Sequence, residues 1–474
     1  MVHHVVVGGG ITGLAAAYAL TRGSRDSSQQ VTLVEAEERP GGKLRSSTFA
    51  GATVDLGPES FVAAVPEMKA LCTALGLEEA IVAPSASKAA VWTRGRLRPF
   101  PDGLVHGVPT SAGAIARSGI LSPGGIMRAG CDLFLPRTEL PPDPTVTQVI
   151  APRFGREVVE RLVEPLLGGI HAGRADRLSM AAVAPHLATA AQRHRSLMQG
   201  LKAARAPKGT KAPSMLVSIA GGLERLIDRL LAALESVEVH TGTPVVSVTR
   251  QADGRYCVLC EHDITLVADD IMLAVPASEA AKILRAMAPE LSSRLEALAY
   301  ASVTTVLLAY ATSAFPRPLD CSGFLVPRYE GKLLTACTVC TTKWPHIRAA
   351  DMTIVRCSTG RWGDERALHL DDDALVEQIQ HELTQALGVQ ERPRERIVTR
   401  WPQAIPQYET GHQARVAEIE AALTSWPGLV LTGASYHGVG LSSCVQDSAR
   451  AVASLRLPHL QADQHSAVAR SLMP

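Results

Sequence analysis

Residues 5–13 read Val-Val-Val-Gly-Gly-Gly-Ile-Thr-Gly and pass directly into the helical pattern Leu-Ala-Ala-Ala-Tyr-Ala-Leu. The valines predict a buried strand, and Gly8, Gly10 and Gly13 fit the spacing G-x-G-x-x-G. The first glycine permits a tight turn, the second lets the backbone approach a pyrophosphate, and the third lets the helix pack on the strand. The helix then presents free N–H groups and its positive dipole end to the phosphates. The stretch therefore predicts a dinucleotide-binding turn.

A carboxylate at the end of the next strand supports this prediction. The strand pattern Val31 to Val34 ends in Glu35, which stands 22 residues after Gly13. A spacing of about 20 residues is typical of the acid that binds a ribose hydroxyl in such units. Strand, turn, helix and acid therefore occur in the order that a dinucleotide-binding β-α-β unit requires.

Composition narrows the class of protein. The 474 residues suffice for about three domains, and 46% of them are hydrophobic, as in ordinary globular proteins. A net charge of +1 and an aromatic content of 4% argue against nucleic acid as a partner. No uninterrupted apolar run reaches the ~18 residues of a membrane span, and the chain enters its first strand without a basic leader. We expect a cytoplasmic protein, with peripheral contact to a membrane left open.

The nine cysteines include two C-x-x-C pairs, Cys257 with Cys260 and Cys337 with Cys340. Such pairs suggest a zinc site on spacing alone. Both, however, lie in runs that we expect to be strands, where positions i and i+3 face opposite sides and cannot chelate one ion. We therefore expect buried thiols and no metal site.

Dinucleotide-domain patterns recur at the start, the middle and the end of the chain, separated by two insertions. The predicted boundaries are 1–84 with 214–280 and 425–460 for the dinucleotide domain, 85–213 for a mostly helical domain, and 281–424 for an α+β domain. Within the last, we expect strands near 302–311, 333–340 and 353–358 and a helix over 371–387. The fold class is α/β.

A locally basic stretch lies in the helical insertion. Residues 177–223 contain no Asp or Glu but several cations, among them Lys202, Arg205, Lys208 and Lys211. One interpretation is a solvated helix face with a loop. The other is a patch for anionic lipid, a partner protein or substrate carboxylates.

Two further segments identify the dinucleotide. Arg39 followed by Gly41-Gly42 resembles the R-x-G-G element of flavin amine-oxidase-type proteins, in which the glycine pair passes close to the flavin. The segment from Leu431 to Leu441 resembles the last cofactor segment of the same superfamily, with glycines that lead into a helix. With the glycine turn, three separated segments in the right order imply tightly bound FAD.

Within that superfamily the chain resembles the porphyrinogen oxidases of haem biosynthesis over nearly its full length. The resemblance rests on Asp55 to Phe61, on Ala-Gly-Arg-Ala-Asp-Arg-Leu-Ser at 172–179, on Trp401 to His412, and on the closing Gly-Val-Gly-Leu-Ser-Ser. It implies a Rossmann-like FAD-binding domain interrupted by an α+β substrate domain and a mostly helical domain. The short form looks most like the soluble coproporphyrinogen III oxidases of Gram-positive bacteria.

Carried over position by position, the resemblance implies a set of FAD contacts. They are Gly8, Gly9, Gly10, Ile11, Thr12, Gly13, Glu35, Ala36, Gly42, Lys43, Gly57, Pro58, Glu59, Ser60, Val245, Trp401, Val439, Gly440 and Leu441. For Val245 and Trp401, simple core packing is the alternative interpretation.

The implied reaction removes six electrons from a porphyrinogen in three rounds. FAD accepts the hydride, and dioxygen reoxidises the flavin and becomes hydrogen peroxide. No catalytic residue is assignable, because the flavin carries the chemistry. Transient contact with a ferrochelatase or a membrane surface is possible for such an enzyme.

Arginines are the natural partners of a porphyrinogen's propionates. Arg94 and Arg96, in the run Thr-Arg-Gly-Arg-Leu-Arg-Pro, alternate on one face if the run is extended, which makes them candidates for substrate binding. The alternative is an exposed strand edge.

Three other functions remain open at this stage. A protoporphyrinogen IX oxidase differs only in the side chains of its substrate. A flavin amine oxidase shares the cofactor segments, but normally has an aromatic residue at the place of Leu441. A non-catalytic flavoprotein would keep the FAD motifs without turnover.

Overall fold

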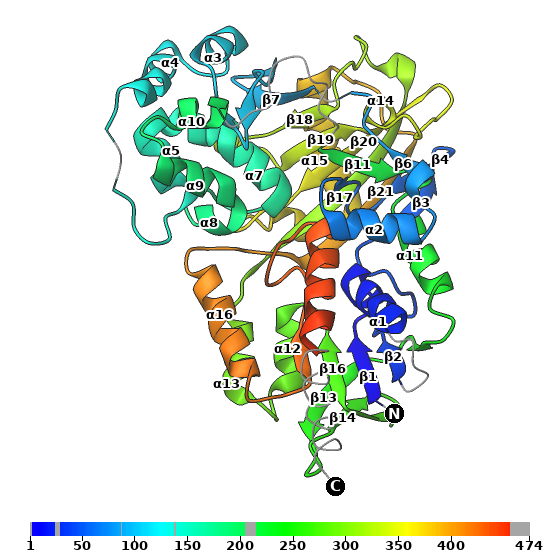
Figure 1. Ribbon diagram of the computed structural model, residues 1–474. Helices are drawn as coiled ribbons and strands as arrows, with labels where there is room; N and C mark the ends of the chain where they lie inside the picture. The colour runs from blue at the N-terminus through cyan, green and yellow to red at the C-terminus, as the bar shows by residue number, and fades with distance from the viewer. Residues whose placement is uncertain (1, 24–28, 87, 137–138, 204–214, 456–474) are drawn as a thin grey trace.

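A five-stranded parallel sheet forms the base of the molecule (Figure 1). The structure, a computed structural model, describes residues 2–23, 29–86, 88–136, 139–203 and 215–455. The strands, in spatial order, are β12 (Glu238–His240), β2 (Gln29–Val34), β1 (Val2–Val7), β16 (Asp270–Leu273) and β22 (Leu429–Leu431). They come from the start, the middle and the end of the chain, and every neighbouring pair is parallel.

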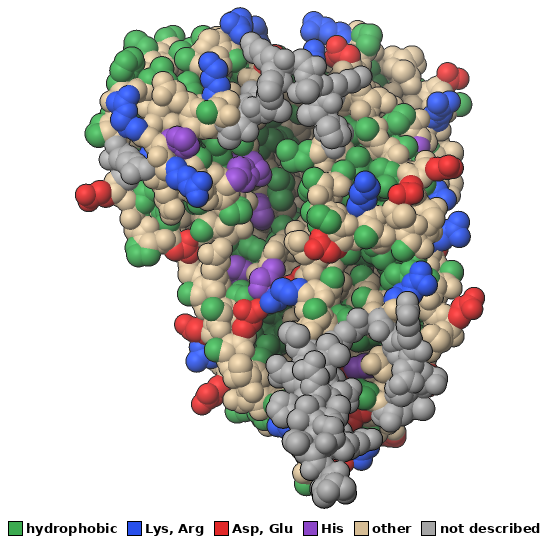
Figure 2. Space-filling view, in the orientation of Figure 1, with side chains coloured by type: hydrophobic (Ala, Val, Ile, Leu, Met, Phe, Trp, Pro, Cys, Tyr) green, Lys and Arg blue, Asp and Glu red, His purple; other side chains and the backbone are tan. Residues whose placement is uncertain are grey.

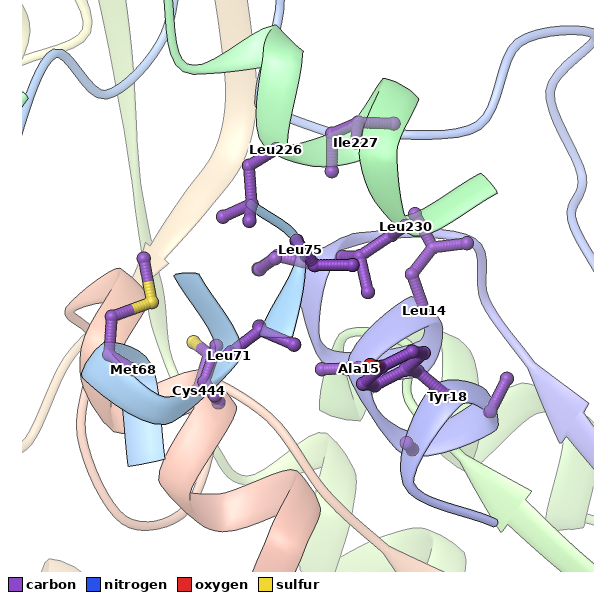
Figure 3. Close-up of a cluster of buried hydrophobic side chains, with 14 of the residues drawn as sticks. Leu14, Ala15, Tyr18, Met68, Leu71, Leu75, Leu226, Ile227, Leu230 and Cys444 are labelled. Atoms are coloured by element: carbon purple, nitrogen blue, oxygen red, sulfur yellow. The ribbon is translucent and has the colours of Figure 1, made fainter. Parts of the chain in front are cut away.

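Helices from three parts of the chain pack together on one face of this sheet. They are α1 (Ile11–Gly23), α2 (Pro66–Ala74), α11 (Glu224–Ala232) and a helix over residues 441–455. Figure 3 shows Leu14 and Tyr18 of α1, Leu71 of α2 and Leu230 of α11 pointing toward one another. These side chains belong to one buried cluster, so apolar burial joins the distant segments.

A seven-stranded sheet forms the second layer of the molecule. Its order is β21 (Glu395–Pro406), β17 (Tyr300–Ala311), β20 (Met352–Thr359), β19 (Leu334–Val339), β18 (Gly323–Leu325), β7 (Ala89–Thr93) and β8 (Arg96–Pro99). All neighbours are antiparallel except β18 and β7. One face packs against α15 (Asp372–Leu387), whose N-cap Asp371 accepts a hydrogen bond from the N–H of Ala374.

Short helices form a third unit beside this sheet, at the upper left of Figure 1. They are α3 (Ala112–Ser118), α4 (Pro123–Gly130), α5 (Val146–Phe154), α6 (Arg156–Val158), α7 (Glu164–His171), α8 (Met180–Val183), α9 (Pro185–Arg193) and α10 (Leu197–Ala203). A π-helical segment over Val159–Val163 joins α6 to α7. The unit has its own buried cluster, and α7 also contacts β18 and β19.

The remaining elements are small. The strands are β3 (Ser46–Phe49), β4 (Ala52–Asp55), β5 (Phe61–Val62), β6 (Ile81–Val82), β9 (Leu104–Val105), β10 (Val108–Pro109), β11 (Leu216–Ile219), β13 (Val245–Arg250), β14 (Tyr256–Cys260) and β15 (Thr265–Ala268). The helices are α12 (Ala277–Leu284), α13 (Pro289–Glu296), α14 (Cys340–Lys343) and α16 (His412–Leu423).

The α/β fold class is confirmed, and several predicted elements are found where they were expected. The strands predicted near 302–311, 333–340 and 353–358 are β17, β19 and β20, and the helix predicted over 371–387 is α15. Two details were wrong. Cys340 begins α14 rather than continuing its strand, and Arg94 lies in the turn between β7 and β8 with φ of 51°.

The division into three domains stays a prediction. Residues 89–99, assigned to the helical domain, form β7 and β8 of the seven-stranded sheet. Part of the predicted basic stretch, with Arg205, Lys208 and Lys211, falls outside the described residues. Within the described residues, no helix is both long and apolar enough to cross a membrane.

A buried ion pair ties the helical unit together. Arg153 of α5 and Asp132 are both almost fully buried, with 3.5 Å between Nη1 and Oδ1. Arg153 donates to the carbonyl oxygens of Arg195 and Ala191. Asp132 accepts hydrogen bonds from Ser196 and from the backbone at the start of α10. Each charge is therefore compensated by the other and by hydrogen bonds.

We predict that R153M lowers the free energy of unfolding by about 3–5 kcal/mol, because it leaves the carboxylate of Asp132 buried without its cation. Urea denaturation followed by circular dichroism measures this. R156M, which removes an exposed arginine nearby, is the matched control and should change the value by less than about 0.5 kcal/mol. A loss below about 1 kcal/mol for R153M, the contribution of a single hydrogen bond, would show that the pair is not essential.

Candidate functional site

The glycine turn lies at the carboxyl edge of the parallel sheet, between β1 and α1. Gly8 has φ of 106°, which favours glycine, and its N–H donates to the carbonyl of Val34 at 2.8 Å. A methyl group added at Gly13 would stand 1.8 Å from the carbonyl oxygen of Gly8, so only glycine allows this approach of helix to strand. In front of Gly10, by contrast, an added methyl group meets no protein atom within 4 Å. The turn is closed on its inner side and open in front.

Glu35 lies at the end of β2, directly beside this turn. Its Oε2 accepts a hydrogen bond from the N–H of Gly9 at 2.5 Å, and its Oε1 accepts one from Glu37 at 2.8 Å. The backbone of Glu35 also bonds to His240 and Thr243, two residues before Val245. The carboxylate therefore stands at the mouth of the glycine turn, as the sequence predicts.

The segment after β2 crosses two other segments at close range. The N–H of Gly41 donates to the carbonyl of Gly9 at 2.8 Å, and Arg39 forms an ion pair with Glu224 of α11. A methyl group added at Gly57 would stand 1.9 Å from the carbonyl oxygen of Lys43. Lys43 itself is solvent-accessible but surrounded by protein, and this desolvation lowers the pKa of its amine.

Asp55 anchors the segment that leads into residues 57–60. Its Oδ1 accepts hydrogen bonds from Ser46 Oγ at 2.7 Å and from the N–H of Leu223 at 2.8 Å. The side chain is buried, and burial raises the pKa of this carboxyl to about 6 against the lowering effect of both hydrogen bonds. The carboxyl fixes the β3–β4 hairpin to the start of α11.

Two cations from the seven-stranded sheet layer hold Glu59. Lys343 Nζ, at the end of α14, lies 2.5 Å from Glu59 Oε1, and Arg356 Nη1 of β20 lies 3.5 Å from Oε2. Arg356 also donates to the carbonyl of Gly57. Burial raises the pKa of Glu59, but Lys343 and Arg356 lower it more, to about 2. The 57–60 segment is therefore fixed to the seven-stranded sheet layer, by residues that sequence reasoning missed.

Hydrogen bonds also fix the loop over residues 432–438, which precedes the helix over residues 441–455. The hydroxyl of Tyr408 donates to the carbonyl of Ala434 and accepts from the N–H of Gly438, both at 2.7 Å. Asp447 accepts hydrogen bonds from Thr432 Oγ1 and from the N–H of Gly433. These contacts position Val439, Gly440 and Leu441 at the N-terminus of the helix over residues 441–455. That helix end joins the glycine turn, because Cys444 bonds to Thr12.

Opposite the 57–60 segment, the seven-stranded sheet presents a row of uncharged side chains, which we call the floor row. Strand register places Thr305, Ser358, Ala336 and Leu325 side by side on one face of β17, β20, β19 and β18. Thr305 Oγ1 donates to the carbonyl of Leu56 and accepts from Trp401 Nε1 at 3.3 Å. Figure 2 shows the hollow between the helical unit and the rest of the molecule, with hydrophobic side chains in its depth.

Most of the predicted cofactor residues meet at this place. The glycine turn, Glu35, Gly42 with Lys43, the 57–60 segment and residues 439–441 converge at the carboxyl edge of the parallel sheet, and Trp401 lies beside Thr305. Arg94, by contrast, donates to the carbonyl oxygens of Gly119 and Ile120, and Arg96 is exposed on β8. Their substrate-binding role stays a prediction.

Comparisons with known proteins agree with this geometry. A family model described as flavin containing amine oxidoreductase matches residues 11–455. The coproporphyrinogen III oxidase of Bacillus subtilis is 33% identical over 97% of this chain and 98% of that protein. The protoporphyrinogen oxidase of Bos taurus is 31% identical over 95% and 97%. A crystal structure of an Exiguobacterium protein, 33% identical, has a TM-score of 0.86 and covers 96% of this chain and 99% of that one.

FAD is the cofactor, and the residues present fit it. The space in front of Gly10 is open to receive a pyrophosphate, and the first turn of α1 carries no acidic residue that would repel it. Glu35, beside Gly9, would accept a hydrogen bond from a ribose hydroxyl. Gly57 adjoins Lys43 and Trp401, and Trp401 bonds to Thr305 of the floor row.

We predict that G10A weakens FAD binding at least about tenfold, because its methyl group projects into the space for the pyrophosphate without disturbing the protein. Titration of apoprotein with FAD, followed by quenching of flavin fluorescence, measures this. G130A is the matched control, since a methyl group there also meets nothing within 4 Å but lies in the helical unit. Wild-type affinity in G10A would show that the pyrophosphate lies elsewhere.

We predict that D55N gains stability over the wild type as pH rises from 4 to 7. The folded-state pKa of Asp55 is raised to about 6 from 3.8, so its contribution is fully present below the unfolded pKa and is lost as pH rises through the folded pKa. The asparagine does not titrate, and the difference should reach about 3 kcal/mol. Urea unfolding at a series of pH values measures it.

D351N, at an exposed aspartate, is the control for this series. Its stability relative to the wild type should not change with pH in this way. A difference between D55N and the wild type that stays constant across the pH range would contradict the raised pKa of Asp55.

Proposed function

This chain belongs to the flavin-containing amine oxidoreductase family, and we propose that it oxidises a porphyrinogen in haem biosynthesis, with coproporphyrinogen III as its substrate. The observation that carries this proposal is the full-length similarity, at 33% identity, to the coproporphyrinogen III oxidase of Bacillus subtilis. Both chains are covered almost completely, so no domain of the relative lacks a counterpart.

FAD, when bound, supplies the hydride acceptor for this chemistry. Oxidation of a porphyrinogen to a porphyrin removes six electrons and six protons. We propose that three dioxygen molecules accept them in three rounds and leave as three hydrogen peroxide molecules. The task of the chain is then to bind the macrocycle, to orient it and to keep water away from it.

The geometry of the cleft supports this role. The floor row of Thr305, Ser358, Ala336 and Leu325 crosses four adjacent strands and carries no charge, as a flat macrocycle requires. It faces the 57–60 segment, whose position is fixed by Lys343 and Arg356. We further propose that the cofactor residues predicted from the sequence contact FAD at this cleft. The floor row has no ionisable side chain, which supports proton release without a dedicated base.

Protoporphyrinogen IX is the second candidate substrate, supported by the 31% identity to the bovine protoporphyrinogen oxidase. The two substrates differ only in peripheral side chains. An amine substrate is less well supported, because Leu441 places an aliphatic group at the helix start.

We propose that the helical unit also mediates transient contact with a ferrochelatase or a membrane surface. Two large hydrophobic side chains there are unusually exposed, Phe134 at 81% and Met127 at 72%. Patches of exposed large apolar side chains are typical of interaction surfaces.

We predict that coproporphyrinogen III, mixed anaerobically with the holoprotein, bleaches the flavin absorbance, and that readmitted air restores it with formation of hydrogen peroxide. Protoporphyrinogen IX should bleach it more slowly at equal concentration. A diamine is the control substrate and should leave the flavin oxidised. Faster bleaching by protoporphyrinogen IX would reverse the assignment, and no bleaching by either would refute it.

A further inference from the structure

A small pocket with an excess of positive charge lies at the side of the floor row, beneath α7. It is lined by Glu164, Pro165 and Gly168 of α7, by Gly173, by Val326, Arg328 and Thr335 near the ends of β18 and β19, and by Arg361. Two guanidinium groups face one carboxylate there. The neighbouring Arg174 and Arg366 do not change this balance, because Asp176 and Asp364 pair with them.

The two arginines of the pocket are incompletely satisfied. Arg361 is only 9% exposed, and within the described part of the chain its one side-chain hydrogen bond runs from Nη2 to the carbonyl of Leu334 at 3.3 Å. Among the described residues, the buried Nε atoms of Arg328 and Arg361 have no hydrogen-bond partner. Buried polar groups without partners are rare in proteins. These N–H groups therefore point to an acceptor that the protein itself does not supply.

Glu164 does not fill this role. Its Oε1 lies 3.7 Å from Arg328 Nε, beyond hydrogen-bond distance. Burial raises the pKa of Glu164 and, with Arg328 nearby, lowers the pKa of Arg361 to about 10. Both directions show that the pocket is poorly solvated, and the effect of Arg328 on Arg361 shows that the two guanidinium groups repel each other.

The position of the pocket relates it to the cleft. Arg361 bonds to the carbonyl of Leu334, which precedes Ala336 of the floor row by two residues across a register shift in β19, so the pocket adjoins that row. The helix α7 covers the same edge, since a methyl group at Gly169 would contact Leu325 at 3.6 Å. The pocket has room for about one water-sized group, which suits the tip of a carboxylate and not a ring.

A second cationic pair stands on the other side of the floor row, but it is already engaged. Arg356 pairs across strands with Thr338, two residues beyond Ala336, and Lys343 lies nearby. Both cations bind Glu59. Of the two cationic groups that flank the floor row, the pocket beneath α7 is therefore the one prepared for an external anion.

We propose that Arg328 and Arg361 form a carboxylate subsite that binds one propionate of a tetrapyrrole lying on the floor row. This inference rests on the proposed function, since a porphyrinogen is the ligand that brings carboxylates to this edge. An arginine pair suits a carboxylate because guanidinium N–H groups donate in a fixed planar geometry. The subsite would hold the macrocycle in one orientation at the 57–60 segment.

Binding of the stable product coproporphyrin III, measured by its fluorescence anisotropy, tests this without turnover. R361M should weaken binding about tenfold or more, the expected cost of a lost charged hydrogen bond. R328M, at a side chain 27% exposed, should weaken it in the same direction and serves if R361M does not retain FAD. R392M removes an exposed arginine of the loop between α15 and β21, outside the pocket, and is the matched control.

Two further arms identify the carboxylate as the recognised group. The tetramethyl ester of coproporphyrin III, in the same detergent buffer, should bind wild type and R361M equally well. E164Q should tighten binding of the tetra-acid by about threefold, because it removes the competing negative charge. A misfolded variant cannot produce that gain.

The subsite is refuted if R361M and R328M bind the tetra-acid within twofold of wild type, or if the ester loses affinity as the acid does. Failure of the proposed function has a different signature, since coproporphyrinogen III would then not bleach the wild-type flavin. The anisotropy measurement on coproporphyrin III remains decisive for the arginines in that case.

Discussion

The cofactor groove depends on two places where backbone meets backbone with no room for a side chain. One is the approach of Gly13 to the carbonyl of Gly8, and the other is the approach of Gly57 to the carbonyl of Lys43. Any other residue at Gly13 or Gly57 would push apart α1 and β1, or the 57–60 segment and its neighbour. The open space before Gly10 and the direction of α1 exist because these contacts are so close.

The local parts of the site could be predicted from the sequence. The glycine turn, Glu35 at the end of β2, and the helix start at residues 439–441 depend on residues close together in the chain, so spacing indicates their geometry. The clamp on Glu59 could not be predicted in this way. Lys343 and Arg356 reach it from about 300 residues away, a separation over which no periodicity applies.

The sequence nevertheless contains one signal that indicates such residues. Arg356 and Arg361 stand in or next to the apolar strand pattern of β20, where a charged residue is costly unless it has a partner. An arginine at such a place indicates a buried acceptor. The sequence instead made Arg94 and Arg96 the candidates for substrate binding, because their run has the pattern of an extended strand. The turn at Arg94 breaks that run. Sequence spacing alone could not show this.

Charge in the cleft is confined to its margins. The floor row is neutral, while ionised groups stand on both sides of it along β19. This separation suits a tetrapyrrole. Its flat apolar ring is stabilised by burial against neutral side chains, whereas its carboxylates need pairs of hydrogen-bond donors. We therefore expect substitutions at the pocket arginines to alter binding of the macrocycle without displacing the 57–60 segment, which Lys343 and Arg356 hold.

The parallel sheet has a consequence for how the protein is made. Its edge strand β22 and the helix over residues 441–455 come from the end of the chain, yet they complete the site that begins at Gly8. Likewise β7 cannot pair until β18 has been synthesised, because residues 89–91 pair with residues 323–325. Pairings this distant form late and leave strand edges open during synthesis. We therefore expect cofactor loading to follow release from the ribosome, and the nascent chain to depend on chaperones that shield unpaired strands.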